Sequence, residues 1–119
     1  MGFDYQGQFN NAVISANLAL TPTQGTVVTL ITGNTIVTNN PVVRVTAAAA
    51  VTGIIVTPGT VPGQILTIIH EGAAANTITM AAAGTSNVAN GVSCIITGPA
   101  QKILVWDNVT ALWYSASTT

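Results

Sequence analysis

Short runs of β-branched residues, separated by Gly, Pro and Asn, limit this chain to one kind of architecture. The runs recur at spacings of roughly 8–12 residues, which is typical of the strands of a sandwich or barrel. Val, Ile and Thr favour strands because their branched side chains are stiff and pack well on a pleated surface. The strands expected from these runs are Thr26–Ile31, Thr35–Thr38, Val42–Ala47, Gly53–Val56, Gln64–His70, Thr77–Met80, Val92–Ile96, Lys102–Trp106 and Ala111–Ser115. The pattern predicts an all-β fold, a small antiparallel sandwich or barrel of about eight or nine short strands.

The N-terminal residues differ from this pattern. We expect two parts, an extended N-terminal arm over 1–25 that serves as a docking segment and a β-domain over 26–119. The arm contains both phenylalanines and one of the two tyrosines, namely Phe3, Phe9 and Tyr5. Because aromatic residues are enriched at interfaces, we expect these three to dock onto another subunit or a partner. The other interpretation is a frayed terminus, or an edge strand whose aromatics enter the domain's own core.

A segment of the arm, Asn11–Leu20, is rich in Ala, Val, Ile and Leu. Its apolar residues follow a mixed period, which is compatible with a short helix or with a strand. The sequence leaves these two alternatives open.

The chain is almost uncharged, with two basic and three acidic side chains among 119 residues. An ordinary soluble domain has about 25% charged residues, whereas this chain has 4% and is 49% hydrophobic. Two cations do not supply the basic surface that binds nucleic acid. No apolar run approaches the roughly 18 residues of a membrane span, and the N-terminus lacks the pattern of a secretory signal. We expect no nucleic-acid or membrane partner, and apolar surface buried against copies of the same chain.

The residue types that perform catalysis are scarce. The only histidine, His70, ends an expected strand and is followed by Glu71. Adjacent strand residues point to opposite faces, so Glu71 is not placed to orient the imidazole as a general base. The single cysteine, Cys94, lies in an apolar run, where a small hydrophobic role is expected. With no metal-ligand spacing present, we predict no enzyme activity, no metal and no cofactor. The competing hypothesis is a small enzyme that uses His70 or Cys94.

The most informative segment is the pair of strands that ends the β-domain. Trp106 and Trp113 lie on either side of a polar turn that begins with Asp107 and Asn108. Two strands joined by a turn of about four residues form a β-hairpin, and aromatic residues opposite each other can stack across it. We expect Trp106, Trp113 and Tyr114 to pack in this hairpin. The alternative is a sugar-binding platform, which requires exposed rings beside Asp107 and Asn108.

From about Val45 to Ser115 the chain resembles a β-structured module that recurs in structural proteins of tailed bacteriophages. The matching features, in chain order, are the Pro58-Gly59 turn, a PGQILT strand start, the NTITM strand, the AGTSNVANG stretch, and a terminal WD…WY hairpin. The resemblance is defined by the order of the turns, and it includes no catalytic residue.

Proteins that look like this are typically capsid decoration (cement) proteins, head fibres, or domains of tail fibres and spikes, and they are commonly trimeric. The resemblance implies a non-enzymatic virion protein, most simply a homotrimeric capsid decoration protein. Such a protein assembles in the host cytoplasm and binds the major capsid protein on the exterior of a phage head. The alternative is a head-fibre or tail-fibre and spike module that binds a host-surface receptor or glycan. We expect a decoration protein, because fibre proteins usually add a long shaft and this sequence contains none.

Overall fold

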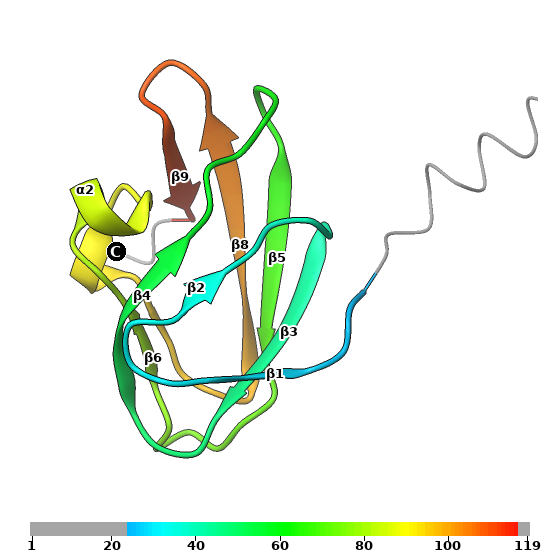
Figure 1. The fold of residues 1–119 in the computed structure, drawn as a ribbon, viewed down its shortest axis with the longest axis vertical. Helices are drawn as coiled ribbons and strands as arrows, with labels where there is room; N and C mark the ends of the chain where they lie inside the picture. Colours follow the sequence, from blue (N-terminus) through cyan, green and yellow to red (C-terminus); the bar gives the residue numbers. More distant parts are fainter. Residues whose placement is uncertain (1–23, 117–119) are drawn as a thin grey trace, which may run out of the picture.

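The computed structural model describes residues 24–116, which fold into two mixed β-sheets (Figure 1). The strands are β1 (Val28–Leu30), β2 (Thr35–Ile36), β3 (Val42–Ala47), β4 (Val51–Val56), β5 (Ile65–His70), β6 (Ile78–Met80), β7 (Ile95–Ile96), β8 (Ala100–Asp107) and β9 (Leu112–Ser115). Between β6 and β7 lie a four-residue helix, α2 (Ala83–Ser86), and a 3-10 turn, η1 (Gly91–Ser93). The predicted all-β fold is confirmed. The arm residues Phe3, Tyr5 and Phe9, and the segment Asn11–Leu20, lie outside the described residues.

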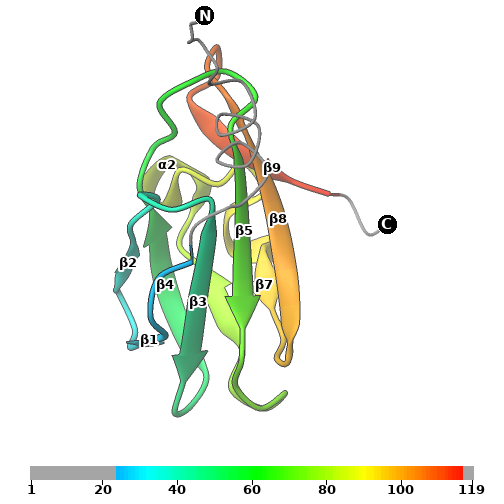
Figure 2. The same cartoon turned by 90° about the vertical axis from the view of Figure 1, so that its right-hand side faces the viewer.

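The chain alternates between the two sheets from β1 to β6. The five-stranded sheet has the order β1-β3-β5-β8-β9, and the four-stranded sheet has the order β2-β4-β6-β7. Within them β1, β3 and β5 run parallel, as do β2, β4 and β6. The strand pairs β1–β2, β3–β4 and β5–β6 therefore form successive coils, stacked side by side in Figure 2.

One end of this stack is closed by strands that turn back. β8 runs antiparallel to β5, β7 runs antiparallel to β6, and β9 runs antiparallel to β8. The expected antiparallel arrangement is thus wrong, because four of the seven strand pairs are parallel. The alternation of apolar residues along a strand is the same in both arrangements. The direction is decided by the long connections, which parallel neighbours require.

The core lies between the two sheets and is formed by both. Each sheet contributes fully buried side chains from alternate positions of its strands, as expected for a strand with one buried face. The largest of the aliphatic ones are Leu66, Ile68 and Leu104 from the five-stranded sheet and Ile54, Ile78, Met80 and Ile96 from the other. One apolar cluster thus stabilises both sheets.

The expected strand Val92–Ile96 is only partly correct. Its last two residues form β7, whereas Gly91–Ser93 forms the 3-10 turn. Gly91 has a φ of +52°, and a Cβ there would lie 2.7 Å from the backbone nitrogen of Ala83. A glycine is required where the backbone approaches α2 this closely.

Candidate functional site

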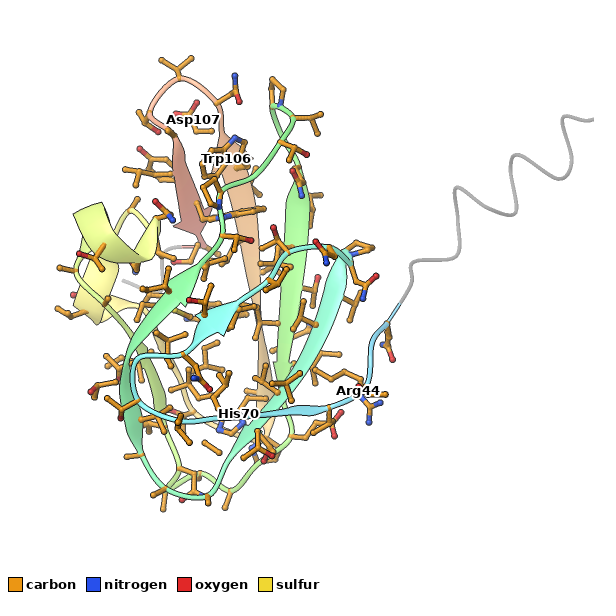
Figure 3. All side chains as sticks on the ribbon, viewed as in Figure 1. Arg44, His70, Trp106 and Asp107 are labelled. Carbon is orange, nitrogen blue, oxygen red and sulfur yellow. The ribbon has the colours of Figure 1, made fainter. Side chains whose placement is uncertain are left out.

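His70 lies in the protein interior with no exposed surface (Figure 3). Its Nδ1 accepts a hydrogen bond from the backbone N–H of Gly72 at 3.1 Å. The ring proton therefore lies on Nε2, which donates to the carbonyl oxygen of Asn76 at 2.6 Å. Both ring nitrogens are engaged by the loop that follows β5, so the imidazole has no free nitrogen for a substrate proton.

Glu71 points the other way and binds Arg44. The distance from Arg44 Nε to Glu71 Oε2 is 2.6 Å, and that from Nη2 to Oε1 is 3.3 Å. The hydrogen bond with Glu71, and then its charge, raise the pKa of Arg44. The expectation that His70 and Glu71 face opposite sides is confirmed, since one is buried and the other exposed. The carboxylate is occupied by a cation and does not orient the imidazole.

Cys94 is a free, fully buried thiol. Burial raises its pKa, and this outweighs the opposing effects of the Lys102 charge and a hydrogen bond with Ser115. A nucleophilic cysteine needs the reverse, a lowered pKa and access to substrate. Within residues 24–116, no three His, Cys, Asp or Glu side chains gather into a group that could bind a metal ion.

The two tryptophans of the hairpin are buried. Trp106 is 4% exposed and Trp113 is 0% exposed, and they pair directly across β8 and β9. A sugar-binding platform requires exposed indole rings, and neither ring is exposed. Tyr114 does not join the pair, contrary to the expected packing of all three. It follows Trp113 in a strand, and so it points to the outer face.

The outer face of the five-stranded sheet presents a group of exposed apolar side chains from neighbouring strands. Ile65 of β5 pairs with Val105 of β8, and Val105 pairs with Tyr114 of β9. Ile103 lies two positions before Val105 on the same face. These four residues, which we call the outer-face patch, are 56%, 43%, 42% and 45% exposed in the order named. A contiguous exposed apolar surface on a small protein is typical of an interaction site.

The patch is nearly free of charge, and its residues come from three adjacent strands. The β8 sequence Ile103-Leu104-Val105-Trp106 is apolar at consecutive positions, so both faces of the strand carry apolar side chains. This run was the signal in the sequence that could have identified the patch.

Comparisons with known proteins identify no relative, since no family model, curated protein or solved structure matches the chain. In residues 24–116 no helix has the length and hydropathy needed to span a bilayer. The outer-face patch is therefore the candidate site that the described residues themselves supply.

Proposed function

We propose that this protein is a non-enzymatic virion component, a homotrimeric capsid decoration protein that binds and stabilises a phage head. The proposal joins the resemblance over Val45–Ser115 to the properties of the described surface. The single observation that carries it is the outer-face patch, which offers apolar area to a neighbouring protein where a monomer would expose it to water.

The apolar patch supports self-association. Ile65, Val105 and Tyr114 form one continuous row of uncharged side chains across β5, β8 and β9. Three copies that turn the outer face toward a common axis would bury the row and raise the fraction of apolar surface removed from water. The sparse charge of the chain places few like-charge repulsions between copies.

The environments of His70 and Cys94 support a structural role for both side chains. His70 uses both ring nitrogens within its own loop, and the Cys94 thiol is buried with a raised pKa. Neither arrangement is suited to bond making in a substrate. In this proposal Phe3, Tyr5 and Phe9 dock onto the major capsid protein, since aromatic side chains supply large contact area.

The oligomeric state is the first test. Native mass measurement should give about three times the 12.0 kDa of one chain. Ile103→Lys, which places a charge in the patch, should convert the trimer to monomer without loss of β-structure by circular dichroism. Val109→Lys is the matched control, because Val109 is 93% exposed on the β8–β9 turn and lies outside the patch. A monomeric native chain, or a trimer unaffected by Ile103→Lys, would overturn the trimer interface.

Capsid binding is the second test. The bridge between Gln24 and Val42 shows that the β-domain begins before Gly25, so a deletion through residue 25 would damage the domain. A full-length variant with Phe3→Ala, Tyr5→Ala and Phe9→Ala tests the arm more specifically than a deletion. It should remain trimeric and lose co-sedimentation with empty heads assembled from the major capsid protein of the same genome. Normal co-sedimentation of this variant would show that the arm is not the docking element.

The alternative, a fibre or spike module that binds a receptor or glycan, makes a different prediction. Tyr114 is the exposed aromatic residue of the described chain. Glycan-array binding that disappears in Tyr114→Ala, together with no binding to heads, would favour the alternative over decoration.

A further inference from the structure

The stack of coils is open at the end opposite β7 and β8. β1 is the edge strand of the five-stranded sheet, and β2 is the edge strand of the four-stranded sheet. Each pairs with a single parallel neighbour, β3 and β4 respectively. Each therefore presents one row of backbone N–H and C=O groups to which a further strand can bond.

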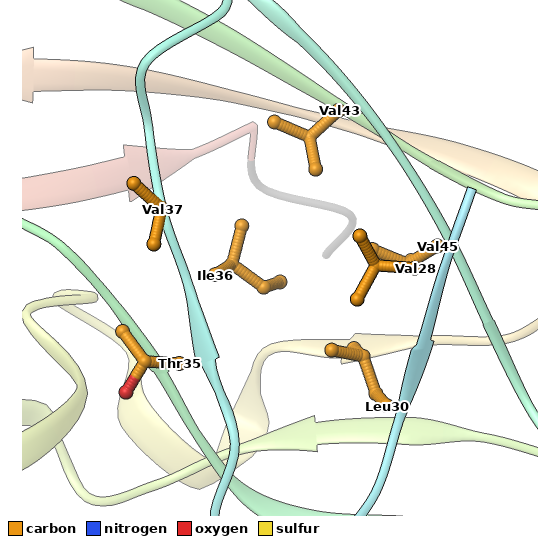
Figure 4. Close-up of a pocket in the computed structure, with 7 residues that line it drawn as sticks. All are labelled: Val28, Leu30, Thr35, Ile36, Val37, Val43 and Val45. Carbon is orange, nitrogen blue, oxygen red and sulfur yellow. The ribbon is translucent and has the colours of Figure 1, made fainter. Parts of the chain in front are cut away.

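An apolar pocket of about 180 Å³ lies between these two edge strands (Figure 4). Leu30 and Ile36 from the edge strands and Val45 from β3 are buried beside it. Val28 and Val37 form its rim and are 49% and 53% exposed. Thr35 supplies the only polar side chain of the lining. The pocket is thus the unfilled end of the core that continues through the stack.

We propose that residues 11–20 of this chain bind over this opening as one more coil. The coils of the stack differ in length, and the two at the open end are the shortest. One coil is the stretch of chain from Val28 to its partner Val45, or from Thr35 to its partner Ile55. The part of the sequence that precedes Gln24 is longer than either stretch, so it contains enough chain for one coil of this size. The same offsets align residues 11–13 with β1 and residues 15–16 with β2.

The first described residue, Gln24, also lies where an added coil would have to join the β-domain. Gln24 forms a parallel bridge with Val42, directly beside the pocket residue Val43. In the proposed arrangement residues 21–23 would connect the added coil to Gln24, as residues 37–41 connect β2 to β3.

The chemistry of the segment fits the pocket. It carries no charge, and most of its side chains are apolar: Ala12, Val13, Ile14, Ala16, Leu18, Ala19 and Leu20. A segment tethered close to its site has a millimolar effective concentration, which gives it an advantage over a second copy of the chain. This coil leaves Phe3, Tyr5 and Phe9 beyond its start, and it does not depend on the proposed capsid function.

Cross-linking tests the position of the segment in the full-length protein. In a Cys94→Ala background, Leu18→Cys is combined with Val37→Cys on the pocket rim and treated with a short bis-maleimide. We expect a cross-link within one chain, identified by peptide mass spectrometry and independent of protein concentration. In the control, Val92→Cys replaces Val37→Cys. Val92 is 60% exposed and lies in η1, remote from β1 and β2, so no cross-link is expected. Cross-links only between chains would identify a second copy as the occupant and overturn the proposal, as would no cross-link.

Hydrogen exchange tests whether the segment protects the edges. Ile14→Asp with Leu18→Asp should raise the exchange rates of the amides of β1 and β2 at least tenfold, because a charged segment leaves the apolar pocket. Exchange in β5 and β8 should not change. Phe3→Asp with Phe9→Asp is the matched control and should leave β1 and β2 protected, although it should impair head binding if the arm docks there. Equal exchange in β1 and β2 for both double variants would overturn the proposal while leaving the proposed function standing.

Discussion

Trp106 and Trp113 face each other across β8 and β9, with ring centroids 5.3 Å apart and ring planes inclined by 60°. Such a tilted arrangement is favourable for aromatic pairs. Trp106 Nε1 donates to Asn108 Oδ1 at 3.2 Å, and Trp113 Nε1 donates to the carbonyl oxygen of Thr57 at 2.9 Å. Thr57 directly follows β4, so Trp113 connects the five-stranded sheet to the four-stranded sheet. The pair therefore has a structural role, and Trp113→Ala should destabilise the hairpin.

Gly59→Ala should destabilise the protein through this pair of tryptophans. A Cβ at Gly59 would overlap Cγ of Trp106 and lie 2.6 Å from its Cδ2. Overpacking of this kind costs about 1–3 kcal/mol, measured as the loss of unfolding free energy in urea. Gly84→Ala is the control, because a Cβ there meets no atom within 4 Å. A Gly59→Ala variant as stable as the control would show that the Trp106 ring moves freely.

His70→Leu should be strongly destabilising although it keeps a side chain of similar bulk. It would leave the carbonyl oxygen of Asn76 and the N–H of Gly72 without their partners in a closely packed loop. We expect a loss of about 2–4 kcal/mol in urea unfolding. Glu71→Leu alters the neighbouring exposed side chain and should cost much less. Comparable losses for the two variants would contradict the structural role assigned to His70.

Asp107 should make the hairpin turn sensitive to acid. The backbone N–H of Val109, at 2.9 Å from Oδ1, and then the hydroxyl of Thr110, at 2.9 Å from Oδ2, lower the pKa of Asp107. A carboxyl with a lowered folded-state pKa stabilises the fold above its unfolded value of about 3.9, and this contribution is lost as pH falls through the folded value.

Asp107→Asn isolates this effect, because the amide does not titrate. The difference in unfolding free energy between wild type and Asp107→Asn should be constant above about pH 5 and shrink below about pH 4. Urea titrations at a series of pH values provide the measurement. A difference that stays the same from about pH 6 to about pH 3 would refute the assignment.

Ala111→Gly should leave the protein equally stable or stabilise it by up to about 1 kcal/mol. Ala111 has a φ of +58°, where a Cβ is strained, and glycine relieves this strain at the expense of a more flexible unfolded chain. Ala100→Gly on β8 is the opposite case, since extended backbone gains nothing from glycine and should lose about 0.5–1 kcal/mol. Thermal or urea unfolding compares the two. Equal losses would mean that position 111 is unstrained.

Local features of the fold were predictable because they depend on neighbouring residues. The run Val42–Ala47 forms β3 with the predicted bounds, and Trp106 is paired with Trp113 around the predicted turn. Strand direction was not predictable. The pairing of Val42 with Thr67, far along the chain, depends on where an intervening strand of the other sheet returns the chain. Nothing in the alternation of either strand specifies that partner.

In the candidate sites, too, the local features were predictable and the long-range ones were not. Alternation predicted that His70 and Glu71 face opposite sides, but not which of them is buried. That is decided by Asn76 and Gly72, whose backbone groups surround the ring only after the loop beyond β5 has folded. Similarly, the outer-face patch needs the lateral alignment of Ile65, Val105 and Tyr114, which come from separate strands. Helix α2 has only four residues, too few to show a period.

The antiparallel return of β7 and β8 makes the architecture extensible in one direction only. Duplication of the stretch from β1 to the start of β3 would insert one whole coil, adding one strand to each sheet while β5, β8 and β9 keep their partners. Homologues that differ in size should do so by whole turns, each as long as the span between paired strands such as Val28 with Val45 or Val51 with Ile78. Chain lengths in such a lineage would differ by whole coils, and the terminal hairpin would be the end that stays the same.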